Sequence, residues 1–222
     1  MREQKLNWIA GVILGLLIIG GGLVCAMMGR IGQEDLKRWK AAPVVQEAGD
    51  LRTLGEGRDV ALTGTISSDA PVAREGLVLY TYWEKEVRYR YKSGGQRQRY
   101  YSWQLKSEVE PPFPLLLNGQ SVTVQSWRAV LYNERVVWVG SRAQLKGFAP
   151  GDQVTVMGTV AALTTPPEVK AEVICGGDRK ACLNALTTTS IMTAVFAGVV
   201  ILVGAGVAGW GLVRLLRGSE HS

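Results

Sequence analysis

Two long stretches of uncharged, apolar residues limit what this chain can fold into. No charged residue lies between Lys5 and Arg30, and none lies between Lys180 and Arg214. At about 1.5 Å of rise per helical residue, each stretch can cross a hydrocarbon core of roughly 30 Å. The composition, 47% hydrophobic and 20% charged, therefore averages two apolar ends and a polar middle, which excludes an ordinary soluble globule. Only two stretches reach this length, which excludes a channel or transporter with many spans.

We predict a span near each end of the chain and a domain between them. The expected organisation is a first transmembrane helix (6–29), a stalk helix and connector (33–57), a β domain (58–174), a juxtamembrane loop with cysteines (175–185), a second transmembrane helix (188–214) and a short tail (215–222). The first span is too long for the apolar region of a cleaved signal peptide, and we interpret Cys25 as a lipid-buried thiol rather than a lipidation site. The bilayer is thus the first expected partner.

Small residues recur at helical spacing in both spans. Gly11 and Gly15 form a G-x-x-x-G pattern, and Ala205 and Gly209 form a second pair of small residues. This spacing lets helix backbones approach closely, either between the two spans or between copies of the chain. The alternative is that glycine is simply common in membrane helices.

The middle part changes to a period of two from Asp59 onward, which is typical of strands. We expect strands at Val60–Ile66 and Leu77–Tyr82, and a long hairpin over Glu84–Leu105 that turns at Ser93-Gly94-Gly95. Further strands are expected at 121–126, 129–132 and 135–139, with a turn at Asn133-Glu134 and a break in the sheet at 111–114.

The last expected strand repeats the first. Val60–Ile66 and Val154–Val160 share the pattern V-x-[LV]-x-G-T-[IV], in which the glycine indicates a bulge or a close backbone approach. Many short strands at this spacing are typical of small barrels and sandwiches. We therefore predict a mainly β fold, a small antiparallel β-barrel or sandwich of the OB-like type, between two transmembrane helices.

The hairpin carries the candidate interaction face. Its members are basic and aromatic residues of both strands: Arg88, Tyr89, Arg90, Tyr91, Lys92, Arg97 and Arg99. Such a surface can contact a protein, anionic lipid or single-stranded nucleic acid, or it can be a solvated face that blunts an edge strand. The net charge of +6 agrees with each of these, although basic flanks are also common in membrane proteins.

The side of the membrane follows from the cysteines rather than from the flanking charges. Lysines and arginines flank both ends of both spans, and a simple count of them would place the middle domain in the cytoplasm, but long translocated domains follow the positive-inside rule poorly. Cys175 and Cys182 are spaced for a small disulfide loop, although they can also be two unrelated thiols. Because a stable disulfide needs an oxidising compartment, we expect an extracytoplasmic middle domain, with both termini on the other side and nucleic acid an unlikely partner.

The middle part resembles the GIDE domain, a module found beside the membrane in mitochondrial ubiquitin ligases and in prokaryotic relatives. The residues that carry the resemblance are Val60–Ile66, Leu79-Tyr80-Thr81-Tyr82, Trp103, Glu110–Leu115 and Gly151–Val160. The resemblance covers roughly residues 51–174 and implies a β domain between two spans. It departs from the ligases after the second span, where they carry a zinc-binding RING finger and this sequence has a tail with His221 and no cysteine.

We find no set of residues for catalysis, metal binding or cofactor binding in the sequence. His221 is the single histidine, and no phosphate-binding loop or H-E-x-x-H or G-x-S-x-G pattern occurs. The expected function is a non-catalytic, membrane-anchored interaction or scaffold protein that binds a protein partner or its own copies. The alternatives are an adaptor without a RING that works with a catalytic ubiquitin ligase, and a membrane-surface enzyme of unrecognised chemistry.

Overall fold

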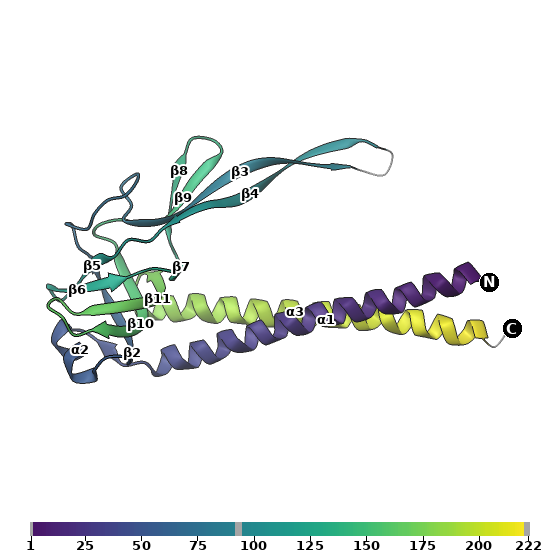
Figure 1. Cartoon of the computed structure of the whole chain (residues 1–222), viewed down its shortest axis with the longest axis horizontal. Coiled ribbons are helices and arrows are strands. Elements are labelled where there is room, and N and C mark those ends of the chain that lie inside the picture. Colours follow the sequence, from purple (N-terminus) through teal and green to yellow (C-terminus); the bar gives the residue numbers. More distant parts are fainter. Residues whose placement is uncertain (1, 92–94, 220–222) are drawn as a thin grey trace. The chain divides into compact units, whose positions relative to one another are not determined.

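The computed structural model describes residues 2–91 and 95–219 of the chain, which form two compact units (Figure 1). The first unit combines residues 1–37 and 186–222, and the second consists of residues 38–185. Lys92, Ser93, Gly94 and His221, which entered the predictions above, lie outside the described residues.

The first unit is formed by two long helices, α1 (Arg2–Ala41) and α3 (Arg179–Ser219). The C-terminal end of α1 and the N-terminal end of α3 belong to the second unit. Both helices are long and apolar enough to cross a membrane, over Ile9–Ala41 and Arg179–Arg214. The stalk helix expected from residue 33 is not separate, because α1 continues through it without a break. No proline interrupts this stretch, and the helix ends just before Pro43, which cannot continue it.

The two helices meet through small residues. A side chain on Gly15 would approach the backbone nitrogen of Ala208 to 2.5 Å, and one on Gly22 would approach Ile201 to the same distance. On α3, Gly204 faces Gly15 and Ile19. The contact therefore uses Gly15 but neither Gly11 nor Gly209, which have no neighbour within 4 Å of such a side chain, and the seam on α3 lies one residue before Ala205–Gly209.

The second unit contains a closed barrel of five strands, and the chain as a whole is mainly β, with 41% strand. The barrel strands are β2 (Asp59–Ile66), β5 (Phe113–Leu117), β6 (Gln120–Gln125), β10 (Gln153–Ala162) and β11 (Glu168–Gly176). They pair in the ring β2-β10-β11-β6-β5, and the β2–β5 pairing closes it. All neighbours are antiparallel except β6 and β11, which are parallel.

Buried aliphatic side chains of alternating strand positions fill this barrel, among them Leu62, Leu115 and Val156, each 0% exposed. The short helix α2 (Ala48–Leu54), where the sequence suggested only a connector, adds the buried Leu51 to the same core. Two short strands, β1 (Val44–Val45) and β7 (Val130–Tyr132), pair with β2 and β11 outside the ring.

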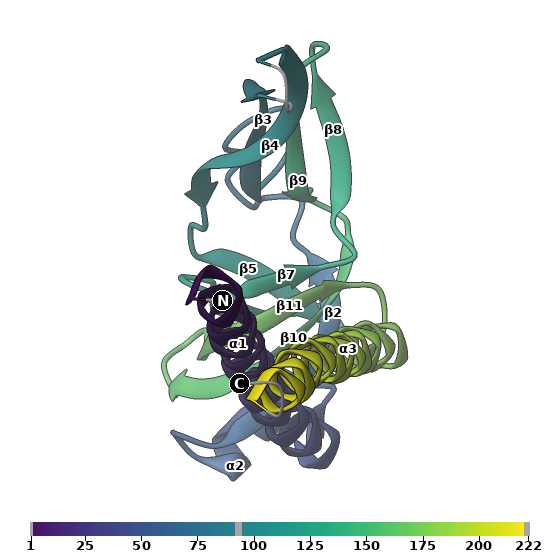
Figure 2. The same ribbon diagram turned by 90° about the vertical axis from the view of Figure 1, so that its right-hand side faces the viewer.

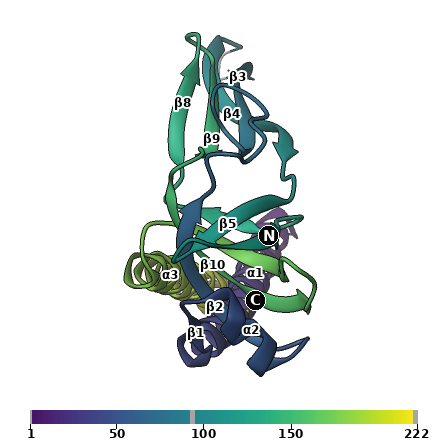
Figure 3. The ribbon, with the colours of Figure 1, turned by 90° about the vertical axis from the view of Figure 1, so that its left-hand side faces the viewer.

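Four more strands form a second sheet in the order β4-β3-β9-β8. They are β3 (Leu79–Tyr91), β4 (Arg97–Val109), β8 (Arg135–Val139) and β9 (Ala143–Phe148). Figures 2 and 3 show this sheet and the barrel at opposite ends of the second unit. A small core of its own, with Leu77, Tyr80, Leu145 and Ala149, covers one face of the sheet.

Several strand predictions need correction. The expected break at 111–114 is shorter than predicted: β4 of the second sheet ends at Val109, and β5 of the barrel begins at Phe113 and includes Pro114. Asn133-Glu134 does not join a hairpin, because β7 pairs with β11 and β8 pairs with β9. Val154–Val160 lies in β10, which is not the last strand, because β11 follows and pairs with it. In each case a distant strand supplies the hydrogen-bond partner, which local periodicity does not show.

Two arginines hold the inner ends of the long helices to the barrel. The guanidinium of Arg179 donates to the backbone carbonyls of Trp39, Lys40 and Ala42, each at 3.0 Å, where α1 leaves carbonyls unpaired. Arg38 donates hydrogen bonds to both Asp59 and Glu172, and its hydrogen bonds to Asp59 lower the pKa of that carboxyl group. A cation at a helix C-terminus is also favoured by the helix dipole.

Candidate interaction surface

The hairpin of β3 and β4 extends beyond the rest of its sheet (Figure 1). The pairing of β3 with β9 ends at Glu84 and Ala143, and the last bond to that side runs from the Lys85 N–H to the Arg142 carbonyl. From there to Tyr91 and Arg97, the two strands pair only with each other. We call residues 85–91 and 97–103 the arm. A ribbon of two strands buries little, so the arm exposes both of its faces.

The register divides the predicted interaction face between two faces of the arm. Arg97 and Arg99 pair with Tyr91 and Tyr89, so these four side chains share one face. Arg88 and Arg90 occupy the intervening positions of β3 and point to the opposite face, where Arg88 pairs with Tyr100. Because successive strand residues alternate between faces, the set named from the sequence cannot act as one surface.

The first face carries a continuous row of rings and cations. We call this row the aromatic–cation strip, and its members are Trp83, Lys85, Tyr89, Tyr91, Arg97, Arg99, Tyr101, Trp103, Trp138 and Lys146. Along the arm, the Arg97 guanidinium lies 3.5 Å from the centre of the Tyr89 ring, and Arg99 and Lys85 each lie 5.0 Å from Tyr101. Such stacking favours a fixed cation position over a freely moving side chain.

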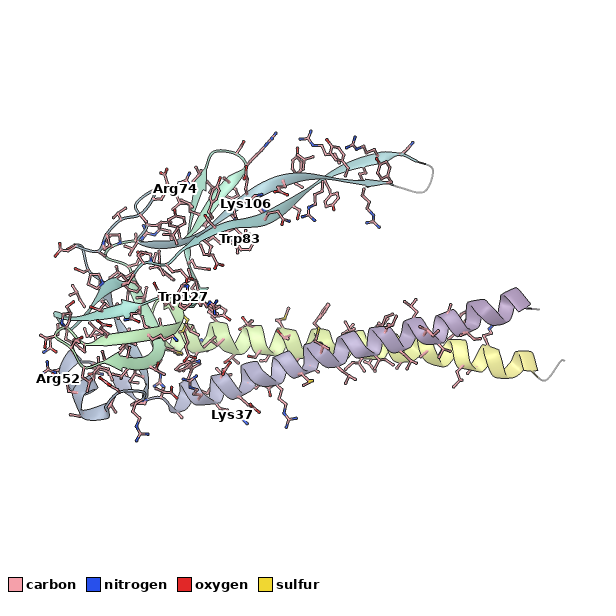
Figure 4. All side chains as sticks on the ribbon, in the orientation of Figure 1. Lys37, Arg52, Arg74, Trp83, Lys106 and Trp127 are labelled. Atoms are coloured by element: carbon pink, nitrogen blue, oxygen red, sulfur yellow. A yellow bond between two sulfur atoms is a disulfide. The ribbon has the colours of Figure 1, made fainter. Side chains whose placement is uncertain are left out.

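The strip continues from the arm onto the four-stranded part of the sheet. The Trp103 and Trp138 rings, from β4 and β8 at its two edges, meet with their centres 5.8 Å apart. Lys146 of β9 lies 5.6 Å from the centre of the Trp83 ring, whose indole N–H donates to the Thr81 hydroxyl at 2.9 Å. Figure 4 shows Trp83 on this sheet, within the second unit.

The strip carries four cations, Lys85, Arg97, Arg99 and Lys146, and among the described residues none of them has an ion-pair partner. On this face of the arm, the described residues 85–91 and 97–103 include no aspartate or glutamate. Glu108 lies on the same face at the base of the hairpin, where it pairs with Thr81 beside Lys146. Large parts of it are open, since Tyr91 is 71% exposed and Trp138 is 61% exposed.

The opposite face of the arm has mixed charge. Glu86 forms an ion pair with Lys106, which lowers the pKa of Glu86 and raises that of Lys106. Arg88 and Arg90 lie further out on this face, and the cation of Arg88 also favours the ionised Glu86. The two faces of one ribbon thus differ in charge balance, and only the strip is purely basic.

Sequence reasoning missed part of the strip. Trp83, Lys85, Trp138 and Lys146 were not named as candidates, and Trp103 was named only for the resemblance to the GIDE domain. The position parity of the hairpin was a usable signal, because the odd-numbered residues from Trp83 to Tyr91 and from Arg97 to Leu105 share this face, up to the register shift at Tyr82/Trp83. Trp138 and Lys146 had no such signal, since their place depends on the pairing of β9 with β3.

The cysteine pair named from the sequence lies where β11 leads into α3. Cys175 at the end of β11 and Cys182 in the first turns of α3 form a disulfide, with Cα atoms 5.3 Å apart. Among the residues that the structure describes, no group of three or more His, Cys, Asp or Glu side chains could hold a metal ion.

A shallow hollow of about 460 Å³ lies on the barrel between Val44, Thr63, Asn118 and Arg179. Two of its polar residues are engaged: Thr63 shares a hydrogen bond of 3.0 Å with Thr155, and the terminal nitrogen of Arg179 binds the carbonyls at the end of α1, whereas the buried Arg179 Nε has no hydrogen-bond partner in the described part of the chain. The hollow therefore serves the junction of helix and barrel, and the aromatic–cation strip is the stronger candidate.

No protein-family model matches this chain, and no curated protein matches it either.

Proposed function

We propose that this chain is a non-catalytic, membrane-anchored interaction protein whose aromatic–cation strip contacts a partner protein. The two apolar helices span the bilayer in this proposal, and the barrel serves as the rigid base from which the arm extends. The single observation that carries the proposal is the strip itself, an exposed row of rings and unpaired cations on one face of a ribbon. Protein–protein interfaces are enriched in tyrosine, tryptophan and arginine, the residue types that make up most of the strip.

The barrel supports the OB-like assignment as the scaffold of this function. Five strands closed in the order β2-β10-β11-β6-β5, with one parallel contact, agree with a small Greek-key barrel. The strip lies outside this ring, on strands inserted between β2 and β5 and between β6 and β10. Insertions on a rigid scaffold commonly carry binding residues.

The disulfide supports an extracytoplasmic position for the second unit. Bonds of this kind persist in oxidising compartments and are rare in the cytosol. Both cysteines are 0% exposed, so the bond is protected from solvent thiols. With the second unit outside the cytoplasm, the partner is an extracytoplasmic protein or a second copy of the chain, and nucleic acid is not expected to reach the strip.

Photo-crosslinking in intact membranes tests the proposed function with a control on the same strand. A photoreactive phenylalanine analogue at Tyr101 lies on the strip, and the same analogue at Tyr100 lies on the opposite face. The two tyrosines are similarly exposed, at 47% and 43%. We expect a discrete adduct from position 101 and none from position 100. Diffuse, low-yield products from both positions would show that the strip has no specific partner.

A further inference from the structure

We propose that the strip binds an extended acidic peptide segment, which adds to the sheet as a new strand along β4. This inference rests on the proposed function and names the chemical class of its partner. Three features of the second unit carry it: an open strand edge, uncompensated cations beside that edge, and the spacing of those cations.

The longest open edge is that of β4, since the outer side of β3 is open only beyond Lys85. Its inner side pairs with β3 from Tyr80 to Tyr91, and it is the outermost strand of the sheet in the order β4-β3-β9-β8. The other edge strand, β8, has five residues, whereas β4 has 13. A long edge presents unpaired N–H and C=O groups, which another extended chain can satisfy. Peptide recognition by strand addition uses this property.

The charge beside this edge selects an acidic peptide. A strand added to β4 places every second side chain on the strip face, next to Arg97 and Arg99. These guanidinium groups already lie against tyrosine rings, which leaves their N–H groups free to donate hydrogen bonds to carboxylates. Arginine binds carboxylates in a two-pronged geometry, and a cation held in place loses less entropy on binding.

The same stacking disfavours flat ligands. Arg97 lies over the Tyr89 ring, and Lys85 lies near the Tyr101 and Trp103 rings, so cations cover ring faces on which a base or a sugar would stack. A carboxylate, in contrast, binds to the cations and does not require an open ring face. The cation–ring pairs therefore favour an acidic polypeptide over a nucleic acid or a glycan.

The spacing of the strip predicts a sequence pattern for the peptide. Arg97 and Arg99 lie two residues apart on β4, about 7 Å, and Tyr101 and Trp103 continue the row at the same interval. A strand alongside matches them with acidic residues at two alternate positions and apolar residues at the next two. The expected pattern is acidic-x-acidic-x-apolar-x-apolar, in either chain direction.

Binding of synthetic peptides to the full chain in nanodiscs of neutral phosphatidylcholine tests this inference. The fluorescent probe peptide has Glu at two alternate positions, Val at the next two and Thr between them, and fluorescence anisotropy reports its affinity. A second peptide with the same sequence carries N-methyl groups on alternate amides, which removes the hydrogen bonds of an added strand. A third carries Lys in place of Glu.

Matched protein variants separate the strip from general charge. R97Q/R99Q removes two exposed cations from the strip, and R88Q/R90Q removes two exposed cations from the opposite face of the same arm. We expect R97Q/R99Q to weaken binding about two- to thirty-fold, the range for two solvent-exposed ion pairs. R88Q/R90Q is expected to change it by less than about twofold, because its cations do not face the peptide carboxylates.

The N-methylated and Lys peptides are expected not to bind. Equal losses in both double variants would overturn the inference, as would unchanged binding of the N-methylated peptide. Displacement of the probe peptide by vesicles of phosphatidylglycerol would identify a lipid surface as the occupant instead. If no acidic peptide binds while position 101 still crosslinks a discrete protein, this inference fails and the proposed function stands. If position 101 gives no adduct, the proposed function itself fails.

Discussion

Gly64 and Gly158 occupy the same position in the two copies of the motif V-x-[LV]-x-G-T-[IV], and both lie where another strand passes closely. A side chain on Gly64 would approach the carbonyl oxygen of Leu116 to 2.5 Å. One on Gly158 would come within 3.0 Å of the Ala171 Cα atom and closer still to the Lys170 carbonyl oxygen, at a shift in the β10–β11 register. The repeat therefore reflects two close strand crossings in one barrel, as the glycine in the pattern indicated.

We expect Gly158→Ala to destabilise the β unit by about 1–3 kcal/mol, the usual cost of forcing an added methyl group into a packed interior. Gly49→Ala is the matched control, because this glycine lies in α2 with no neighbour within 4 Å of the added methyl group. There the change should leave stability unchanged or raise it slightly by reducing the freedom of the unfolded chain. Urea unfolding of the full chain in detergent measures both, and equal stability of the two variants would contradict the close crossing.

At the scale of elements, the two long helices meet along a seam of small residues. On α3, the buried Ala197, Gly204 and Gly211 recur every seven residues, and on α1 the buried Gly15 and Gly22 have the same separation. A period of seven keeps one stripe of each helix toward its neighbour. Glycine alone did not identify this stripe, since Gly20, Gly21, Gly198 and Gly206 would meet nothing within 4 Å.

Gly15→Leu is expected to push the helices apart, because even its Cβ would overlap Ala208. Gly11→Leu is one turn away on α1 and should leave the pair intact, since its Cβ would meet nothing within 4 Å. Pulsed electron resonance between spin labels at the exposed Leu16 and Leu202, in a Cys25→Ala background, measures the separation. We expect a longer, broader distance distribution for Gly15→Leu only; an unchanged distribution would argue against the seam.

The β3–β4 hairpin is the element that the sequence described best. Alternation of aromatic and charged residues predicted a hairpin over Glu84–Leu105, and the structure pairs Glu84 with Gln104 and Val87 with Tyr101 within this range. The strands run further, to Leu79 and Val109, because β9 pairs with the base of β3. Local alternation thus identified the arm, and long-range pairing extended it into a sheet.

At the scale of the whole molecule, the disulfide connects the barrel to the beginning of α3. Its redox state in cells would report which compartment contains the second unit. Cys175 ends the barrel strand β11, and Cys182 lies within the part of α3 that belongs to the second unit. A loop with a sequence separation of seven residues is short, so the bond constrains the unfolded chain moderately. By the loop-entropy relation the stabilisation is about 2–3 kcal/mol.

Replacing both cysteines by serine should therefore lower the unfolding free energy of the β unit by about 2–3 kcal/mol. In membranes from cells that express the intact chain, we expect maleimide to label Cys175 and Cys182 only after denaturation and reduction. Topology reporters fused to the termini and inserted into the middle domain should place the domain outside the cytoplasm. Labelling of both thiols in denatured but unreduced protein, with a cytoplasmic reporter signal, would reverse the proposed orientation.

Local chemistry in the sequence was enough to predict the helices at both ends, the mainly β middle and the hairpin. Uncharged runs, a period of two and turn residues act over a few neighbours, and such signals are read without knowing the fold. The ring closure of β2 with β5, the pairing of β7 with β11 and the joining of Trp138 and Lys146 to the arm all depend on contacts between distant residues. Only the tertiary structure decided them, because a strand's partner is selected by the packing of the whole core and not by its own residues.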